Sequence, residues 1–258
     1  MMNFDNQAQA YDQRVGFTGE TISAIRDFLF SLKPEARVLE IGAGTGFVGI
    51  ELAEKAASYT GLDASEGMLS VFRERAAERG LKPTLVQADA DKDWGIPGSS
   101  CDLIFGSRVF HLLEPEHLSS EILRVADQGA ILASGNVLRP KDSVHHGLRR
   151  ILHQLLREEG YEPKKKKESL SKVFSSVSDG GNYTSKVVSE WTRPFVPADA
   201  IASWEHKHGL AGNDLPEDLH NAIVVRVKEK ATAEFGDLTK AMELREFYQI
   251  DFITIIKP

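Results

Sequence analysis

The sequence predicts an α/β fold with a doubly wound, seven-stranded and mostly parallel sheet. Short β-branched runs alternate with helical patterns through the first half of the chain, as in sheets that carry helices on both faces. The last such run, 247–256 (FYQIDFITII), is apolar and predicts a closing strand. The composition agrees, because 41% hydrophobic residues and a formal net charge of -7 are typical of a globular protein.

The first half contains the clearest elements. Strands are expected at 37–41, 58–62, 84–87, 102–105 and 130–134. Helices are expected at 47–57, after Ser65, and at 115–127. Ser65 is the expected N-cap of the second of these helices, whose buried side comprises Met68, Leu69 and Phe72.

The pattern changes after Asn136. A helix is expected to open at Asp142 and Ser143, with an apolar stripe of Val144, Leu148, Ile151 and Leu155. A sixth strand is expected at 184–191, followed by helices at 198–207 and 216–235.

The sequence argues against several classes of protein. No apolar run approaches the ~20 residues of a membrane-spanning helix, and Met1–Arg14 does not resemble a signal peptide, so a cytoplasmic location is expected. Cys101 is the only cysteine, which excludes an internal disulfide and a multi-cysteine zinc site, and no metal site is expected. The acidic balance argues against a nucleic-acid partner, because phosphate binding needs clustered lysine and arginine.

A glycine-rich turn, 40–46 (EIGAGTG), separates the first strand from the next helix. Such a turn lets a ligand approach the backbone, and the following helix offers free N–H groups to an anion. Residues 44–49 (GTGFVG) have the spacing of a dinucleotide fingerprint, but the glycine that directly ends the strand is Gly42. Counted from Gly42, the third glycine position falls on Phe47, so the spacing disfavours a nicotinamide cofactor.

Residues 38–46 (VLEIGAGTG) resemble motif I of class I S-adenosylmethionine-dependent methyltransferases. Three later segments fall where this family has its other motifs, namely 59–65 (YTGLDAS), 87–90 (QADA), and the approach to strand four at 96–97 (IP) with 101–104 (CDLI). The resemblance covers about half of the chain, from Tyr11 to Ser134. It implies a Rossmann-like fold with S-adenosylmethionine as cofactor and S-adenosylhomocysteine as product.

The resemblance also implies how a single domain, 1–258, is organised. Cover helices are expected at 1–33, a cofactor-binding core at 36–136, a helical substrate cover with strand six at 137–245, and the final strand at 246–257.

Several residues match the cofactor-binding positions of the family. The carboxylate of Asp63 can accept hydrogen bonds from both ribose hydroxyls. Asp89 is expected at the adenine amino group, the Ala90 N–H at an adenine ring nitrogen, and Glu40 near the amino group of the cofactor. The remaining expected contacts are Gly42, Ala43, Gly44, Gly46, Ala64, Met68 and the backbone of Ser107, although Met68 also fits the core.

Two further cofactor contacts are expected in an amino-terminal helix. Arg14 could meet the methionine carboxylate and Tyr11 could line the reacting end, because the two residues are three apart and share one helix face. A surface arginine and a half-buried tyrosine are the alternative.

His111, just past the fourth strand, is the candidate general base, because histidine exchanges protons near neutrality. A structural histidine beneath the cofactor is the alternative.

The expected function is methyl transfer to an oxygen, nitrogen or carbon nucleophile of a small organic molecule. Methylation of protein or RNA, and a non-catalytic S-adenosylmethionine-binding module, are the alternatives. The Asn/Asp-Pro-Pro-aromatic signature of many base and glutamine methyltransferases is absent from strand four. The oligomeric state is left open.

Overall fold

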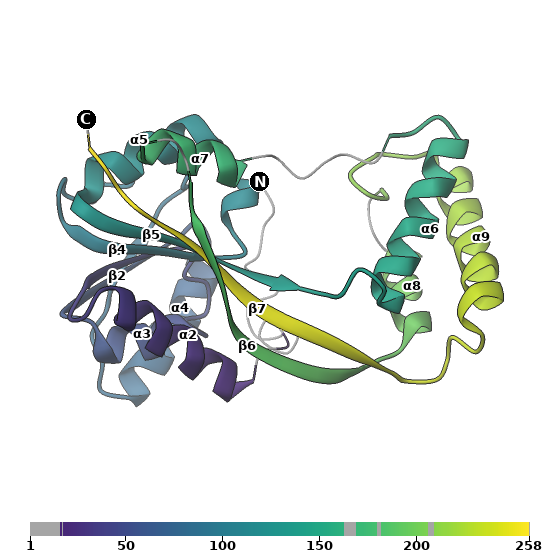
Figure 1. Cartoon of the computed structure of the whole chain (residues 1–258), viewed down its shortest axis with the longest axis horizontal. Coiled ribbons are helices and arrows are strands. Elements are labelled where there is room, and N and C mark those ends of the chain that lie inside the picture. Colours follow the sequence, from purple (N-terminus) through teal and green to yellow (C-terminus); the bar gives the residue numbers. More distant parts are fainter. Residues whose placement is uncertain (1–15, 17, 163–168, 180–181, 206–208, 258) are drawn as a thin grey trace. The chain divides into compact units, whose positions relative to one another are not determined.

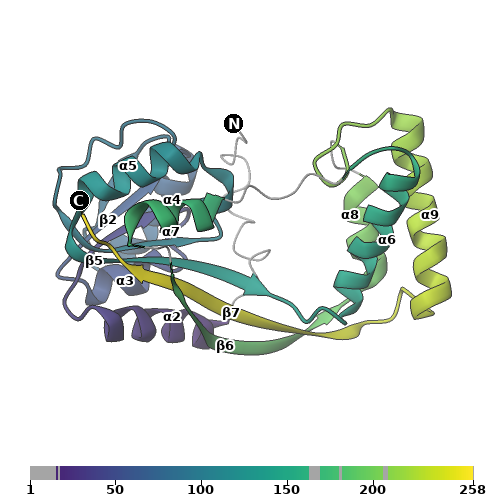
Figure 2. The same ribbon diagram turned by 45° about the horizontal axis from the view of Figure 1, so that its top comes forward.

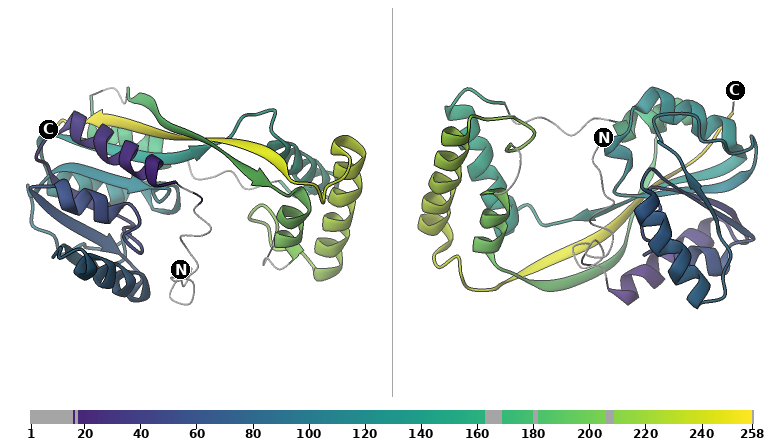
Figure 3. Two further views of the ribbon diagram at one scale, coloured as in Figure 1. Left: turned by 90° about the horizontal axis from the view of Figure 1, so that it is seen from below. Right: turned by 180° about the vertical axis from the view of Figure 1, so that it is seen from behind.

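The computed structural model describes residues 16, 18–162, 169–179, 182–205 and 209–257. Within these residues, seven strands form one mixed, mostly parallel sheet with the order β3-β2-β1-β4-β5-β7-β6 (Figure 1). Figure 3 shows β7 running opposite to its neighbours β5 and β6. The predicted α/β fold with a seven-stranded, mostly parallel sheet is therefore confirmed.

In the first half of the chain, β1 to β4 begin and end within two residues of their predicted positions, whereas β5 begins four residues earlier and ends four residues later than predicted. The strand bounds are β1 Arg37–Ile41, β2 Ser58–Asp63, β3 Thr84–Gln87, β4 Cys101–Ser107, β5 Ala126–Leu138, β6 Thr184–Phe195 and β7 Met242–Thr254. The pairs β1–β2, β2–β3, β1–β4 and β4–β5 are parallel. Because parallel strands end at the same edge, the carboxyl ends of β1 to β4 lie together.

Helices cover both faces of the sheet in the larger of two compact units (Figure 2). They are α2 Gly19–Leu32, α3 Gly49–Lys55, α4 Glu66–Glu78, α5 Pro115–Val125 and α7 Ser169–Val177, with a short 3-10 helix, η2, at Phe110–Leu112. The described part of the expected 1–33 cover, α2, packs beside α3. The ring of its Phe28 lies 5.5 Å from the ring of Phe252 in β7, so α2 is part of the layer on the sheet.

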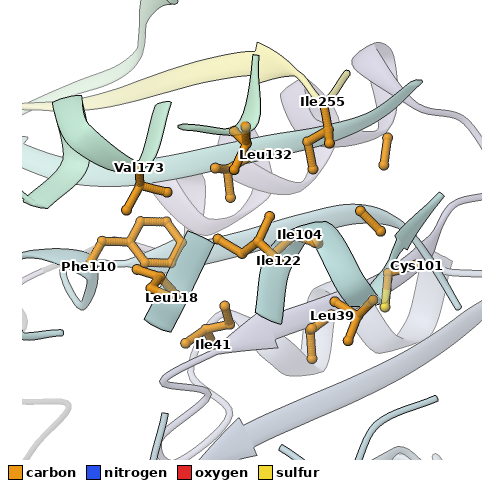
Figure 4. Close-up of a cluster of buried hydrophobic side chains, with 14 of the residues drawn as sticks. Leu39, Ile41, Cys101, Ile104, Phe110, Leu118, Ile122, Leu132, Val173 and Ile255 are labelled. Carbon is orange, nitrogen blue, oxygen red and sulfur yellow. The ribbon is translucent and has the colours of Figure 1, made fainter. Parts of the chain in front are cut away.

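Helix α7 was not predicted from the sequence, which shows only a short polar stretch with a few apolar residues there. Val173, Phe174 and Val177 have no exposed surface, and their spacing places them on one face of α7. They join a core formed by β1, β4, β5 and α5, of which Figure 4 shows Leu39, Ile104, Leu118, Ile122, Leu132 and Val173. This burial anchors β4, whose carboxyl end contributes to the candidate site.

The chain divides into two compact units. Unit 1 comprises Met1–Val137, Lys167–Ser189 and Tyr248–Pro258, and unit 2 comprises Leu138–Lys166 and Glu190–Phe247. The expected cover region, 137–245, is thus shared, because α7 and the start of β6 belong to unit 1.

Unit 2 contains α6 Val144–Glu158, α8 Pro197–Glu205 and α9 Glu217–Phe235. The expected stripe of α6 packs in a core with residues of α9. As predicted, Ser143 precedes α6, and its hydroxyl accepts a hydrogen bond from the His146 N–H at 3.4 Å. None of the described helices is long and apolar enough to cross a membrane.

A buried carboxylate stabilises unit 2. Glu246 in β7 is 2% exposed, and its oxygens accept hydrogen bonds from Nε of Arg139 at 2.7 Å, Nε of Arg193 at 2.8 Å and Nε1 of Trp191 at 3.1 Å. The two guanidinium groups outweigh the effect of burial and lower the pKa of the Glu246 carboxyl. The nearby His145 is held neutral, since burial and the charges of Arg139 and Arg149 lower its pKa to about 4.

Candidate cofactor-binding site

The expected cofactor residues follow four neighbouring parallel strands. The glycine loop follows β1, Asp63 ends β2, Asp89 comes soon after β3 and Ser107 ends β4. The strand register places Asp63 beside Gln87 and Glu40 beside Phe105. These groups therefore meet at the carboxyl edge of the sheet, where open α/β folds bind their ligands.

Asp63 connects the glycine loop to β2. Its Oδ2 accepts a hydrogen bond from the Gly44 N–H at 2.8 Å, and its Oδ1 accepts one from the Ser65 N–H at 2.9 Å. Ser65 caps α4 as predicted, because its hydroxyl accepts the Met68 N–H at 3.2 Å. A carboxylate has about four acceptor positions, so these bonds are compatible with further bonds from ribose hydroxyls.

The three glycines of the loop have different roles. All have positive φ angles, +71° for Gly42, +55° for Gly44 and +75° for Gly46. A Cβ at Gly42 would lie 2.9 Å from a methyl group of Val109, and a Cβ at Gly46 would lie 2.4 Å from the ring of Phe72. For a Cβ at Gly44, the nearest atom of the described residues is the Gly42 carbonyl oxygen, 4.0 Å away. Gly42 and Gly46 are thus required by packing, whereas the described residues leave room for a Cβ at Gly44.

Glu40 lies beneath this loop and is 2% exposed. Its Oε2 accepts a hydrogen bond from the Tyr59 hydroxyl at 2.5 Å. Burial raises the pKa of the Glu40 carboxyl to about 8, although the Tyr59 bond acts in the opposite direction. Gly61 is the strand partner of Glu40, and a Cβ at Gly61 would lie 3.0 Å from side-chain atoms of Ala43 and Leu85 and 3.2 Å from the Tyr59 ring.

The loop after β3 is held by its own polar groups. Asp89 accepts a hydrogen bond from the Asp91 N–H at 3.1 Å and forms an ion pair with Lys92 at 3.4 Å. The buried Trp94 donates from Nε1 to the Ala90 carbonyl at 3.1 Å. In the part of the chain that the structure describes, the Ala90 N–H has no hydrogen-bond partner, so it is available to a ligand.

The end of β4 is tied to β7. The Ser107 hydroxyl and the Tyr248 hydroxyl are 2.7 Å apart, and Tyr248 is fully buried, which raises the pKa of its phenol. A Cβ at Gly135 would lie 1.9 Å from the Tyr248 hydroxyl, so only glycine fits beside it. His111 follows in η2 and is half-buried, between the buried Phe110 and Leu112, which is 50% exposed.

The remaining expected cofactor contacts differ in how far they are buried. Ala43 is 5% exposed and Met68 is 3% exposed, which favours the core position for Met68, whereas Ala64 is exposed. Tyr11 and Arg14 lie outside the described residues. Among the residues that are described, no group of three or more histidine, cysteine or acidic side chains could hold a metal ion.

Three residues of this site were missed by sequence reasoning. Tyr59 holds Glu40, and Tyr248 holds Ser107. A Cβ at Gly49 would lie 2.4 Å from the Tyr59 hydroxyl and 2.6 Å from Oε2 of Glu40. The one sequence signal for this arrangement is Gly49, the last glycine of the GTGFVG run at 44–49 whose dinucleotide interpretation is disfavoured.

Known proteins share this fold. A family model described as a methyltransferase domain matches residues 38–129. A demethylmenaquinone methyltransferase from Clavibacter sepedonicus is 30% identical over 226 residues, covering 81% of this chain and 84% of that protein. The crystal structure of the YcgJ protein from Bacillus subtilis, 19% identical, superposes with a TM-score of 0.55 over 92% of this chain and 99% of that one.

A solved structure from Bacillus halodurans, described as a methyltransferase, has a TM-score of 0.58 at 15% identity and covers 93% of this chain and 100% of that one. The chain spans between 2% and 46% of the length of three other curated relatives.

The fold and the carboxyl-edge site define a class I S-adenosylmethionine-dependent methyltransferase. The similarity to the Clavibacter protein over most of both chains shows that this chain belongs to that family. The resemblance stated from the motifs is confirmed, and with it S-adenosylmethionine as the cofactor of the family.

Proposed function

We propose that the protein transfers a methyl group from S-adenosylmethionine to a small organic molecule. The observation that carries this proposal is that three groups lie at one sheet edge: the Gly44 loop, the Asp63 carboxylate, and the Ala90 N–H, which has no hydrogen-bond partner among the described residues. Two relatives named as methyltransferases of demethylmenaquinone and of aklanonic acid support a small organic acceptor.

The protein's own groups have simple tasks in this reaction. When bound, S-adenosylmethionine supplies a methyl group on a sulfonium, which the acceptor's nucleophile takes by direct displacement as the carbon–sulfur bond breaks and S-adenosylhomocysteine leaves. Asp63 holds the ribose and the Gly44 loop admits the cofactor to the backbone. Alignment of the two reactants and exclusion of water supply most of the acceleration.

The acceptor's proton needs a recipient when the nucleophile is a hydroxyl or an acidic carbon. We propose that His111 takes this proton, since it follows β4 at the same edge and is half-buried. An amine that is already neutral needs no such base, so this role depends on the nucleophile.

Calorimetry tests cofactor binding directly. The protein should bind S-adenosylmethionine and S-adenosylhomocysteine more tightly than any nicotinamide dinucleotide, and tighter binding of a dinucleotide would overturn the proposal. Gly44→Val should abolish binding, because its side chain would enter the open space beside the loop. Gly80→Val is the matched control, since Gly80 has a φ of +69° and open space but lies after α4.

The acceptor class needs a separate experiment. Labelled methyl donor should transfer its label to a component of a small-metabolite extract when the protein is present. Transfer to RNA or to protein, with none to a small molecule, would contradict the proposed acceptor class and leave methyl transfer itself intact.

A further inference from the structure

Arg108 has an unusual backbone conformation at the end of β4. Its φ is +59°, a left-handed conformation that side chains other than those of glycine, asparagine and aspartate rarely adopt. The Arg108 N–H donates to the Gly135 carbonyl at 2.8 Å, and the next residue, Val109, touches the position that a Cβ would take at Gly42. Arg108 is therefore held directly beside the cofactor loop.

The side chain of Arg108 is exposed, and it makes no hydrogen bond or ion pair with the residues that the structure describes. Among the arginines of unit 1 that the structure describes, it is the one whose guanidinium makes no hydrogen bond or ion pair. Each of the others has a carboxylate or carbonyl partner, namely Arg26, Arg37, Arg73, Arg75, Arg79 and Arg124.

Strained backbone is concentrated at functional sites, where the surrounding structure maintains it. Glycine at position 108 would adopt this conformation without strain, so the arginine brings a cost to the fold that no side-chain hydrogen bond or ion pair with the described residues of unit 1 offsets. An arginine fork matches a carboxylate or a phosphate with two parallel hydrogen bonds.

We propose that Arg108 binds an anionic group, a carboxylate or a phosphate, on the methyl acceptor and so selects acidic acceptors. The inference rests on the proposed function, because it places the acceptor at the edge where the cofactor binds. Arg108 and His111 then have separate tasks: Arg108 orients the acceptor, and His111 receives its proton.

Two substitutions remove the guanidinium and introduce a residue that tolerates the positive φ angle at position 108. Arg108→Gly relieves the positive φ, and Arg108→Asn places a residue that tolerates this conformation. Both variants should fold at least as stably as the parent protein. Glu35→Gly is the matched control, because Glu35 also has a positive φ, of +50°, but lies before β1.

The experiment uses the full chain saturated with S-adenosylhomocysteine and labelled at the arginine side-chain nitrogens. The Nε resonance missing in Arg108→Asn identifies Arg108. Titration with benzoate or inorganic phosphate, at constant ionic strength, should shift this resonance, and benzamide should not. Calorimetric titration with the effective anion, which does not depend on this resonance, should show binding about tenfold weaker or worse for Arg108→Gly and Arg108→Asn, and normal binding for Glu35→Gly.

The outcomes separate the two proposals. Failure to bind S-adenosylhomocysteine contradicts the proposed function. Normal cofactor binding with no anion-dependent shift, or with equal shifts for benzamide, overturns the role of Arg108 alone. A loss of about tenfold or more in S-adenosylhomocysteine affinity in Arg108→Asn would assign the guanidinium to the cofactor carboxylate and also overturn it. Benzoate and phosphate, compared with each other, distinguish carboxylate from phosphate acceptors.

Discussion

The hydroxyl of Tyr59 donates a hydrogen bond to Oε2 of Glu40 across 2.5 Å, inside the protein and directly beneath the glycine loop. The two residues come from neighbouring parallel strands, and Gly49 and Phe72 enclose them. This pair holds an otherwise costly buried acid in place and thereby supports the loop that borders the candidate cofactor site.

Tyr59→Phe should destabilise the protein by about 1–3 kcal/mol, because the buried Glu40 carboxyl loses a hydrogen-bond donor. Urea denaturation near neutral pH measures this loss. Tyr161→Phe in unit 2 is the control, since the Tyr161 hydroxyl has no hydrogen bond among the described residues. Equal stability of the two variants would show that the Tyr59 bond contributes nothing.

Gly49→Ala should cost about 1–3 kcal/mol, because its Cβ would overlap the Tyr59 hydroxyl and Oε2 of Glu40. Gly19→Ala is a matched control, since Gly19 also begins a helix and has no atom within 4 Å of an added Cβ. Alanine is preferred over glycine within helices by about 0.5–1 kcal/mol, so the control should be neutral or stabilising. Thermal denaturation compares the two, and a neutral Gly49→Ala would mean that the pair can move aside.

The raised pKa of Glu40 makes stability depend on pH. Burial raises this pKa from 4.5 to about 8, so between these values the folded protein holds a proton that the unfolded chain has released. This contribution is fully present below pH 4.5 and is lost as the pH rises to about 8. The resulting slope is at most about 1.4 kcal/mol per pH unit.

Glu40→Gln should reduce this slope, because glutamine does not titrate. Urea denaturation of both proteins in buffers from mildly acidic to mildly alkaline pH measures the difference. Parallel stability curves for the parent and the variant would show that Glu40 does not titrate in this range.

Asp63→Ala should weaken S-adenosylmethionine binding by about tenfold or more, since it removes charge-assisted bonds to the ribose. It should also lower stability, because the Gly44 and Ser65 N–H groups lose their acceptor. Asp93→Ala controls for this second effect, since Asp93 accepts the Gly95 N–H in an exposed turn. Calorimetric titration gives the dissociation constants, and an unchanged value in folded Asp63→Ala would exclude the ribose contact.

His111→Gln separates the two roles of His111. As a general base, its loss should slow methyl transfer by about 10²–10⁴-fold while cofactor affinity and folding stay intact. The rate of the parent protein should then rise with pH through the titration of a histidine. Single-turnover rates with an identified acceptor provide the measurement. Near-normal turnover in His111→Gln would assign catalysis to alignment and desolvation.

Local signals were sufficient for much of the cofactor half. The strand at 84–87 has the predicted bounds, and Ser65 and Ser143 cap the helices that the sequence assigned to them. Strand alternation, helix caps and glycine turns depend on residues within a few positions of one another, so a single sequence reveals them. The carboxyl-edge position of Asp63 follows for the same reason, because a parallel sheet was predicted.

The tertiary structure decided what depends on distant segments. Tyr59 and Glu40 are 19 positions apart, and Ser107 and Tyr248 are 141 apart, so their pairing requires the strand register and order. The same holds for helix α7, whose three buried residues are recognised as core residues only because they pack with β4, β5 and α5. The left-handed conformation of Arg108 arises in the same way, from its bond to Gly135 in a neighbouring strand. The helix and strand propensities of neighbouring residues indicate where the elements form. Burial and hydrogen bonding between elements far apart in the chain determine which side chains come into contact.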